Sequence, residues 1–508
     1  MTRPITTLLA FLLILAPAGA AAAAPAAMGA HDTAEGKAEG RVAADQATSN
    51  KTSKKISNKT SKKTAKKGQA PALWMVIPFV VMLLCIAILP LTFEHFWESN
   101  RNKLIVSCLL GLPVAAYFAF SGTENMHHLT HTLFEYVAFM CLLGSLYVIS
   151  GGILLRGDLP PTPTVNVGFL ALGAVLASFM GTTGAAMLLI RPMITINTHR
   201  KKRVHTIIFF TFLVANIGGL LTPLGDPPLF MGYLRGVPFA WTFKMLPQWA
   251  MMVGTLLAIY FIWDTILWRK DTEARAKAKR AVERVPLSLT GLVNVPLLAG
   301  VVLCVAFGAA FPVLIGSGAA GFGVRELAMI GLAAASWIVT SKQLRSDNDY
   351  TFHPILEVAA LFLGIFLTMI PAVVLLKVRG GELGVSEPWQ FFWATGLLSS
   401  FLDNTPTYVV FFSLAEGDPA TLAQNFGPEV LTATIKTTSG AVPEKILTAM
   451  SLGAVFMGAN TYIGNGPNFM VKAIADERGI KMPSFFGYMG YAFLILVPIF
   501  AVYTFIWF

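Results

Sequence analysis

The sequence is poor in charged residues and in cysteine. Asp, Glu, Lys and Arg make up 13% of its 508 residues, against about 25% in a typical soluble domain. Together with a hydrophobic content of 55%, this scarcity excludes an ordinary water-soluble fold. The four cysteines all lie in apolar segments without metal-ligand spacing, so we expect them to be small buried apolar side chains.

Signatures of catalysis are also missing. The chain contains no H-E-x-x-H zinc motif, and Gly316-Ser317-Gly318 lies in an expected loop without an assigned base. We therefore expect no enzymatic activity and no cofactor.

What the sequence has instead is a series of apolar runs, each long enough to approach the roughly 20 residues that cross a bilayer as a helix. Those around Gly181 and Asp403 are interrupted at their centres by Gly, Pro, Thr or Asn, which favours re-entrant hairpins. The runs cover residues 72–93, 104–120, 132–155, 165–198, 204–234, 245–268, 289–311, 324–340, 353–376, 388–414, 446–471 and 486–508.

The expected fold is an all-α polytopic membrane protein with two repeats of inverted topology. Residues 72–270 form the first repeat and residues 289–508 the second, and a basic cytoplasmic linker, residues 271–288, joins them. Each repeat contains five spans, one of which is a broken helix, and one re-entrant hairpin.

The N-terminus precedes this membrane region. Residues 1–20 combine Arg3, a short apolar core and Ala18-Gly19-Ala20, which is typical of a secretory signal peptide. Residues 21–71 are rich in Lys, Ser and Thr and are expected to form a disordered periplasmic tail. Much of the net charge of +11 lies in this tail, so the basic balance does not indicate nucleic-acid binding.

The remaining Lys and Arg residues predict the orientation. Most of them, including Arg200-Lys201-Lys202-Arg203 and those of residues 269–284, fall in loops that are cytoplasmic if the mature N-terminus is outside. We expect a multi-pass protein of the bacterial inner membrane with both mature termini in the periplasm.

Three pairs of motifs indicate an internal repeat. His131-x-x-x-Glu135 recurs 222 residues later as His353-x-x-x-Glu357, and at the same offset residues 178–183 (SFMGTT) match residues 400–405 (SFLDNT). At an offset of 239, residues 219–228 and 458–467 share the pattern G-x-x-T-x-[IL]-G-[DN]-x-P. Three matches in the same order favour an inverted-repeat transporter.

The breaks are the expected ion or substrate site. Backbone groups in lipid must be satisfied internally, so a broken helix persists only where it faces protein or a polar cavity. There it offers the hard oxygen ligands that suit Na⁺ or exchange with H⁺, although a packing kink filled by small residues is the alternative. The candidate residues are Thr182, Thr183, Thr222, Gly225, Asp226, Asp403, Asn404, Thr405, Asn460, Thr461, Asn465 and Asn468.

Asp403 is the first candidate among them, because an acid in mid-membrane costs roughly 3 kcal/mol or more. It could exchange a proton for Na⁺, or it could cap a helix inside the hairpin. The same argument from the cost of a buried acid applies to Asp226. However, an Asp that precedes a proline, as Asp226 precedes Pro227, is also common in ordinary turns.

Further proton-relay candidates lie on the first turns of two spans. His131 with Glu135, and His353 with Glu357, each share one helix face, which fits a relay, an ion pair or a cap. Arg191 could pair with an acid or a substrate, or extend its charge to the membrane interface.

At these residues the sequence resembles the ion transporter superfamily, and within it the NhaD-type sodium/proton antiporters. The H-x-x-x-E span, Leu402-Asp-Asn-Thr405 and Gly218-Gly-x-x-Thr-Pro-Leu-Gly-Asp226 carry the likeness over about residues 72–508. The resemblance implies a homodimer in the lipid bilayer, with a scaffold domain and a mobile transport domain that exchanges Na⁺ and H⁺.

Two departures leave the substrate open. Met180-Gly-Thr-Thr-Gly184 has no acid where such antiporters often carry one, and Gly464-Asn-Gly-Pro-Asn468 is closer to the superfamily's carboxylate (CitMHS) and arsenite carriers. The leading hypothesis is Na⁺/H⁺ antiport by alternating access, which the two acids favour. The alternative is a Na⁺- or H⁺-coupled symporter of a di- or tricarboxylate such as citrate, which Arg191 and the half-helix N-termini favour.

Overall fold

The computed structural model describes residues 71–508, except 158, 273–287, 317 and 429–431. The predicted signal peptide, nearly all of the predicted tail and most of the predicted linker 271–288 lie outside the described residues.

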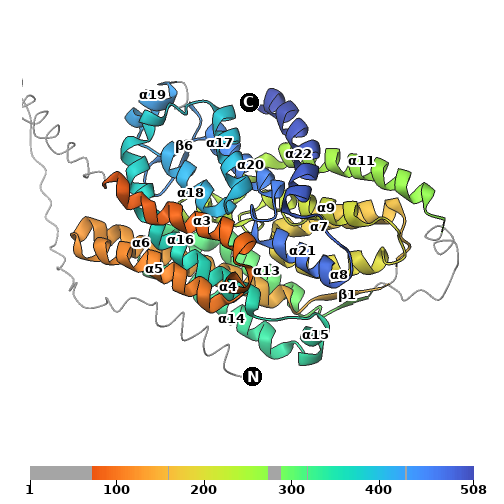
Figure 1. Ribbon diagram of the computed structural model, residues 1–508. Coiled ribbons are helices and arrows are strands. Elements are labelled where there is room, and N and C mark those ends of the chain that lie inside the picture. The colour runs from red at the N-terminus through yellow and green to blue at the C-terminus, as the bar shows by residue number, and fades with distance from the viewer. Residues whose placement is uncertain (1–70, 158, 273–287, 317, 429–431) are drawn as a thin grey trace, which may run out of the picture. The chain divides into compact units, whose positions relative to one another are not determined.

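Long apolar helices dominate the described chain (Figure 1), and eight of them are long and apolar enough to cross a membrane. This confirms the all-α polytopic membrane fold. The eight are Leu73–Pro90, Asn100–Phe120, Thr123–Ser150, Pro163–Met180, Val204–Leu221, Phe239–Lys270, His353–Leu383 and Phe485–Trp507.

Long helices α3 (Ile77–Thr92), α5 (Asn100–Phe120), α6 (Thr123–Ser150) and α16 (His353–Arg379) form one packed group. Helices α13 (Asn294–Ala306) and α14 (Val324–Val339) cover the other side of α6. The middle of α6 and of α16 is buried, whereas α3 and α5 expose Leu, Ile and Phe side chains, as expected where lipid is the solvent.

Both predicted hairpins are helix pairs with a break at the predicted point. Helices α7 (Pro163–Met180) and α8 (Thr182–Ile196) pack together and meet at Gly181, whose φ of 79° favours glycine. Helices α17 (Pro388–Phe401) and α18 (Asn404–Ala415) do the same, with Leu402 and Asp403 between them.

The two other breaks also lie where the motifs predicted them. Helix α9 (Val204–Leu213) continues through the 3₁₀ turn η2 (Ile217–Leu221) and a further turn at residues 222–226 into α10 (Pro227–Leu234). Likewise α20 (Glu444–Met457) continues through η8 (Gly458–Asn460) into α21 (Gly466–Glu477). In each case Pro lies in the first turn of the second piece, where its missing N–H costs nothing.

The broken helix of each half packs against the hairpin of the other half. Helix α10 contacts α18, and α21 contacts α8. Two further helices, α11 (Leu246–Lys270) and α22 (Phe485–Trp507), belong neither to the hairpins nor to the broken helices. Both expose apolar side chains.

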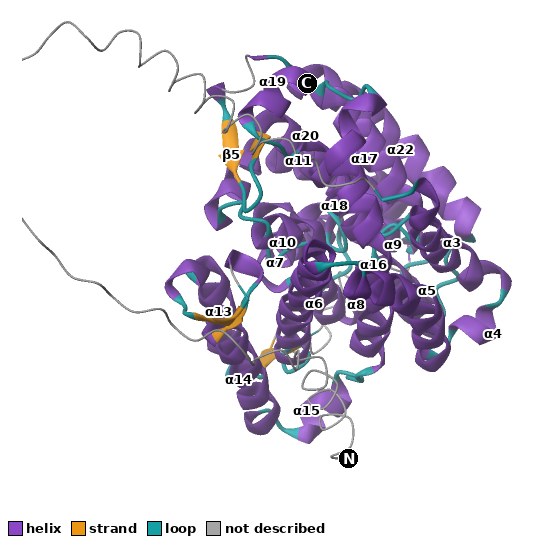
Figure 2. Ribbon diagram, turned by 90° about the vertical axis from the view of Figure 1, so that its left-hand side faces the viewer, coloured by secondary structure: helices purple, strands orange, loops and turns teal. Residues whose placement is uncertain are grey.

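Short elements cap the bundle, and the strands among them are small (Figure 2). The three two-stranded antiparallel sheets pair β1 with β2, β3 with β4 and β5 with β6. The strands are β1 Leu154–Arg156, β2 Ser288–Thr290, β3 Val313–Ile315, β4 Phe322–Gly323, β5 Thr434–Lys436 and β6 Ala441–Pro443. The remaining helical pieces are η1 Leu73–Val76, α4 Glu94–Trp97, η3 Phe239–Met245, η4 Gly308–Ala310, η5 Gly318–Ala320, α15 Lys342–Asp347, η6 Gly380–Leu383 and α19 Pro419–Phe426.

Candidate functional site

Asp226 is the point at which all four breaks meet. It precedes α10 as its N-cap residue and is fully buried. One carboxylate oxygen accepts hydrogen bonds from Thr182 Oγ1 at 3.3 Å and Asn465 Nδ2 at 3.0 Å, and the other from Asn404 Nδ2 at 2.6 Å. The carboxylate thus joins both hairpins to both broken helices.

These four residues are two pairs of repeat equivalents. Thr182 and Asn404 are 222 residues apart at the starts of α8 and α18, and Asp226 and Asn465 are 239 apart as N-caps of α10 and α21. The offsets are those of the matching motifs, so positions related by sequence converge on one buried cluster. We call these four residues the central cluster.

Equivalent threonines fasten each break to its hairpin. The hydroxyl of Thr222 donates to the carbonyl of Ser178, and that of Thr461 donates to the carbonyl of Ser400. Each hydroxyl also accepts an N–H two residues further on, Leu224 at 3.1 Å and Ile463 at 3.3 Å. Both hydroxyls are therefore engaged in holding the backbone.

Residue 225 must be glycine because the backbone of Gly219 approaches it closely. The carbonyl of Gly225 accepts a hydrogen bond from Thr182 N at 2.9 Å, and a Cβ at residue 225 would overlap the backbone of Gly219. Gly464 is similarly pressed against the carbonyl of Gly458. Each break is thus a tight backbone turn that brings main-chain oxygens to the cluster.

Asparagines surround the second break. Asn468 is fully buried and donates to the carbonyls of Gly458 and Thr461, both at 2.9 Å, and Asn460 donates to Ser400 Oγ at 2.9 Å. Asn216, at the start of η2, donates to Asn468 Oδ1 at 2.7 Å.

Two of these amides keep a free oxygen. Within the described part of the chain, Asn216 Oδ1 and Asn460 Oδ1 are buried and have no hydrogen-bond partner. Buried polar atoms are rarely unpaired, and an unpaired amide oxygen is a ligand for a cation. Asn216 was not among the predicted residues, although an Asn inside the apolar run 204–234 carries the signal that singled out Asp403.

Asp403 lies in the middle of the second hairpin, as the sequence predicted. It is the N-cap of α18, where its carboxylate accepts the N–H of Thr405 at 2.9 Å, and it is half-buried. Thr405 turns its hydroxyl to Asn404 Oδ1 at 3.4 Å. Thr183 is half-buried in the first turn of α8. Asp403 thus performs the capping role that was the alternative, beside the central cluster.

The relay candidates lie farther away and pair with basic residues. Glu135 binds Arg235 at 3.2 and 3.3 Å, and His131 Nδ1 lies 3.8 Å from the same carboxylate. Arg235 follows α10 at the end opposite Asp226, about 12 Å along the axis at 1.5 Å per residue.

In the equivalent pair, the partner of Glu357 is a lysine of another helix and not His353 on the same helix face. Glu357 pairs with Lys103 of α5 at 2.6 Å, and His353 contributes its main-chain oxygen to Asn100 at 2.9 Å. Both glutamates thus form ion pairs with basic residues outside their own helices, whereas the ion pair expected from the sequence was with the histidine on the same helix face.

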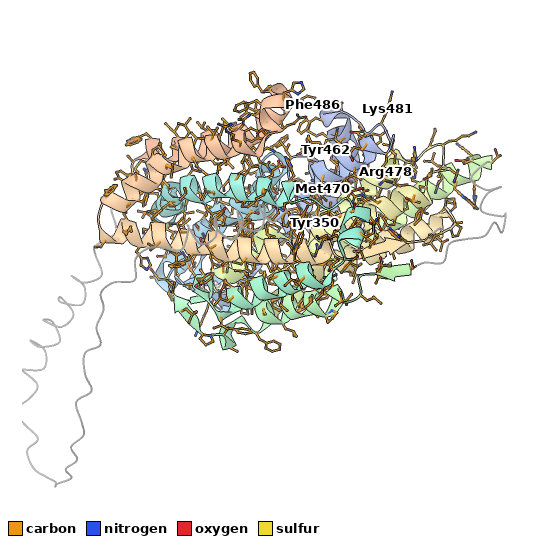
Figure 3. The ribbon with its side chains drawn as sticks, turned by 90° about the horizontal axis from the view of Figure 1, so that it is seen from below. Tyr350, Tyr462, Met470, Arg478, Lys481 and Phe486 are labelled. Carbon is orange, nitrogen blue, oxygen red and sulfur yellow. The ribbon has the colours of Figure 1, made fainter. Side chains whose placement is uncertain are left out.

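Arg191 pairs with an acid from another element. Its Nε lies 3.2 Å from Asp349 Oδ2, and Arg478 approaches the same oxygen at 3.5 Å. Arg478, labelled in Figure 3 together with Tyr350, follows α21 at the end opposite Asn465. Charged groups thus lie at the outer ends of α10 and α21, and the central cluster lies at their inner ends.

Comparison with known proteins identifies the family. A family model described as "Putative citrate transport" matches residues 68–508. A Synechocystis protein named as an uncharacterized transporter is 26% identical over 306 residues, which cover 58% of this chain and 65% of the relative. The finer likeness to NhaD-type antiporters stays a prediction. The chain spans less than two thirds of that relative's length, and it belongs to the family that the matching model describes.

Proposed function

We propose that the protein is a Na⁺/H⁺ antiporter in which Asp226 exchanges a proton for Na⁺. The observation that carries the proposal is the environment of this carboxylate. It is fully buried, and its hydrogen-bond partners in the described chain are one hydroxyl and two neutral amides. An acid in the membrane interior is costly and marks ion pathways. No Lys or Arg of the described residues bonds to this carboxylate, so a proton or a metal cation is the natural counter-charge.

The amides allow the cluster to serve both ions. An Asn side chain can present its NH₂ to a bare carboxylate or its oxygen to a cation. Rotation of Asn404 and Asn465 would turn donors into ligands, and the free oxygens of Asn216 and Asn460 would add to them. Na⁺, a hard cation, suits carboxylate, carbonyl and hydroxyl oxygens.

The doubled architecture supports alternating access. Four half-helices meet at the cluster, two from each half, so a small shift of the hairpins against the broken helices would open the cluster to one side or the other. Operation as a homodimer in the bacterial inner membrane, with both mature termini in the periplasm, belongs to the same proposal.

A second candidate is Na⁺- or H⁺-coupled symport of citrate or a related carboxylate. The family description favours it. So do the N-termini of α8, α10, α18 and α21, which begin beside the cluster and carry the positive ends of the helix dipoles. Against it stands the fixed negative charge of Asp226 and Asp403, which would repel a polyanion.

The test uses the purified full chain in proteoliposomes that contain a pH dye and an acidic lumen. External Na⁺ should raise the internal pH, while the same concentration of K⁺ should not. In parallel, uptake of radiolabelled citrate is measured with and without a Na⁺ gradient. Na⁺-dependent citrate uptake with no Na⁺-driven proton efflux would replace the antiport proposal by the symport one.

A further inference from the structure

A basic cavity lies between the α8–α9 turn and the end of α11. It has a volume of about 110 Å³ and is lined by Arg200, Lys201, Lys202, Leu267, Lys270 and Asp271. In Figure 1 the end of α11 lies on the same side of the bundle as α8 and α9. The Lys and Arg pattern predicts that this side is cytoplasmic.

The walls of the cavity are fixed by a buried polar network. Asp264 of α11 is fully buried and binds Arg200 at 2.6 and 2.8 Å and His205 at 2.8 Å. Asp271 accepts the backbone N–H of Lys201 at 2.8 Å. These bonds tie the turn to α11 on the two sides of the cavity.

The charge in the cavity is predominantly positive. Among the lining residues, the four basic side chains of Arg200, Lys201, Lys202 and Lys270 outnumber the single acidic one of Asp271. In addition, Arg200 is buried and its Nε has no hydrogen-bond partner in the described chain. A buried guanidinium N–H without an acceptor calls for an anionic oxygen.

An apolar surface leads away from the cavity along α11. Ile262 and Ile266, one helical turn apart, are 61% and 49% exposed, and Phe261 beside them is 43% exposed. Leu267, the residue after Ile266, lines the cavity itself. The site is thus apolar on its membrane side and basic at its end, which matches a molecule with an anionic head and acyl chains.

We propose that this cavity binds the phosphate headgroup of an anionic phospholipid, with the acyl chains along the exposed face of α11. Basic pockets at the cytoplasmic ends of membrane helices are suited to such headgroups. Free phosphate shares the head chemistry, but it would gain nothing from Ile262 and Ile266.

The experiment is a thermal-unfolding titration of the full chain in neutral detergent with phosphatidylglycerol, phosphatidylcholine or inorganic phosphate. Phosphatidylglycerol should raise the Tm in a saturable way, because a ligand of the folded state stabilises it by mass action. The variant Lys202→Gln/Lys270→Gln should need at least about fivefold more lipid for the same rise. A matched control, Lys342→Gln/Lys481→Gln, also removes two exposed basic side chains and should behave as the wild type.

Three results would overturn the proposal. The first is an equal rise with phosphatidylcholine, which would show that the headgroup charge is not recognised. The second is an unchanged titration of the Lys202/Lys270 variant, which would place the lipid elsewhere. The third is a rise with inorganic phosphate that matches the lipid, which would make the site one for a soluble anion.

Discussion

The two halves of the molecule interrupt their helices at matching positions, but they carry an acidic residue at different ones of these positions. The first half has Asp226 at its broken helix, where the second has Asn465, and the second has Asp403 at its hairpin, where the first has Gly181. The consequence differs as well, because Asp226 receives donors from both halves while Asp403 caps its own hairpin. The positions that match between the two halves give the site its geometry, and the positions at which the two halves differ give it its charge.

The largest expected effect comes from removing the central acid. Asp226→Asn keeps the shape but deletes the proton carrier, so Na⁺-driven proton flux in proteoliposomes should fall to that of protein-free vesicles. Protein yield and size-exclusion profile serve as the control for folding. Flux near the wild-type rate in a well-folded variant would remove Asp226 from the mechanism.

Moving the acid across the repeat should recover part of that loss. In Asp226→Asn/Asn465→Asp the carboxylate lies at the equivalent N-cap, beside the same partners, so we expect measurable flux between about 1% and 20% of the wild type. Each tenfold loss corresponds to about 1.4 kcal/mol. A double variant as inactive as Asp226→Asn alone would mean that the two breaks are not interchangeable.

A smaller effect is expected at Asp403. Asparagine also caps helices well, so Asp403→Asn should fold normally and change the apparent Na⁺ affinity only about two- to fivefold. The change arises because Asp403 interacts electrostatically with Asp226. Loss of all flux in this variant would instead make Asp403 the exchanging group, as the sequence first suggested.

The smallest functional effect should come from the two threonines that fasten the breaks. Thr222→Val and Thr461→Val each remove a buried hydrogen bond, worth about 0.5–1.5 kcal/mol, so both should lower the Tm. The apparent Na⁺ affinity should change less than about threefold, and serine at either position should restore the Tm. A large affinity change without a stability change would make these hydroxyls ion ligands.

Much of this arrangement could be predicted from the sequence, because breaks in apolar helices need specific residues. Gly181, Pro227, Pro467 and the paired motifs marked the places where the structure interrupts its helices. The sequence pattern that predicts a break is local, because the glycine and proline residues at the break are the ones that interrupt the helix. The apolar run 289–311 likewise contains a helix, α13, although at 13 residues it is shorter than the helices that are long enough to span a membrane.

Partners distant in the chain could not be predicted in the same way. Glu135 binds Arg235 and Glu357 binds Lys103, and nothing in their own helices encodes these pairs. The hydrogen bond between Asn404 and Asp226 likewise joins residues 178 positions apart, which no local pattern predicts. Asn216 lies just outside the repeated motif at residues 219–228, so the comparison of motifs did not predict it.

The most direct test of the central claim is proton release on Na⁺ binding, measured with a pH indicator in weakly buffered detergent solution. If Na⁺ displaces a proton from Asp226, wild-type protein should release protons on addition of NaCl but not of KCl. Asp226→Asn should release none, while Asp403→Asn should still do so. Equal release from wild type and Asp226→Asn, or no release from the wild type at any pH at which it transports, would contradict the account.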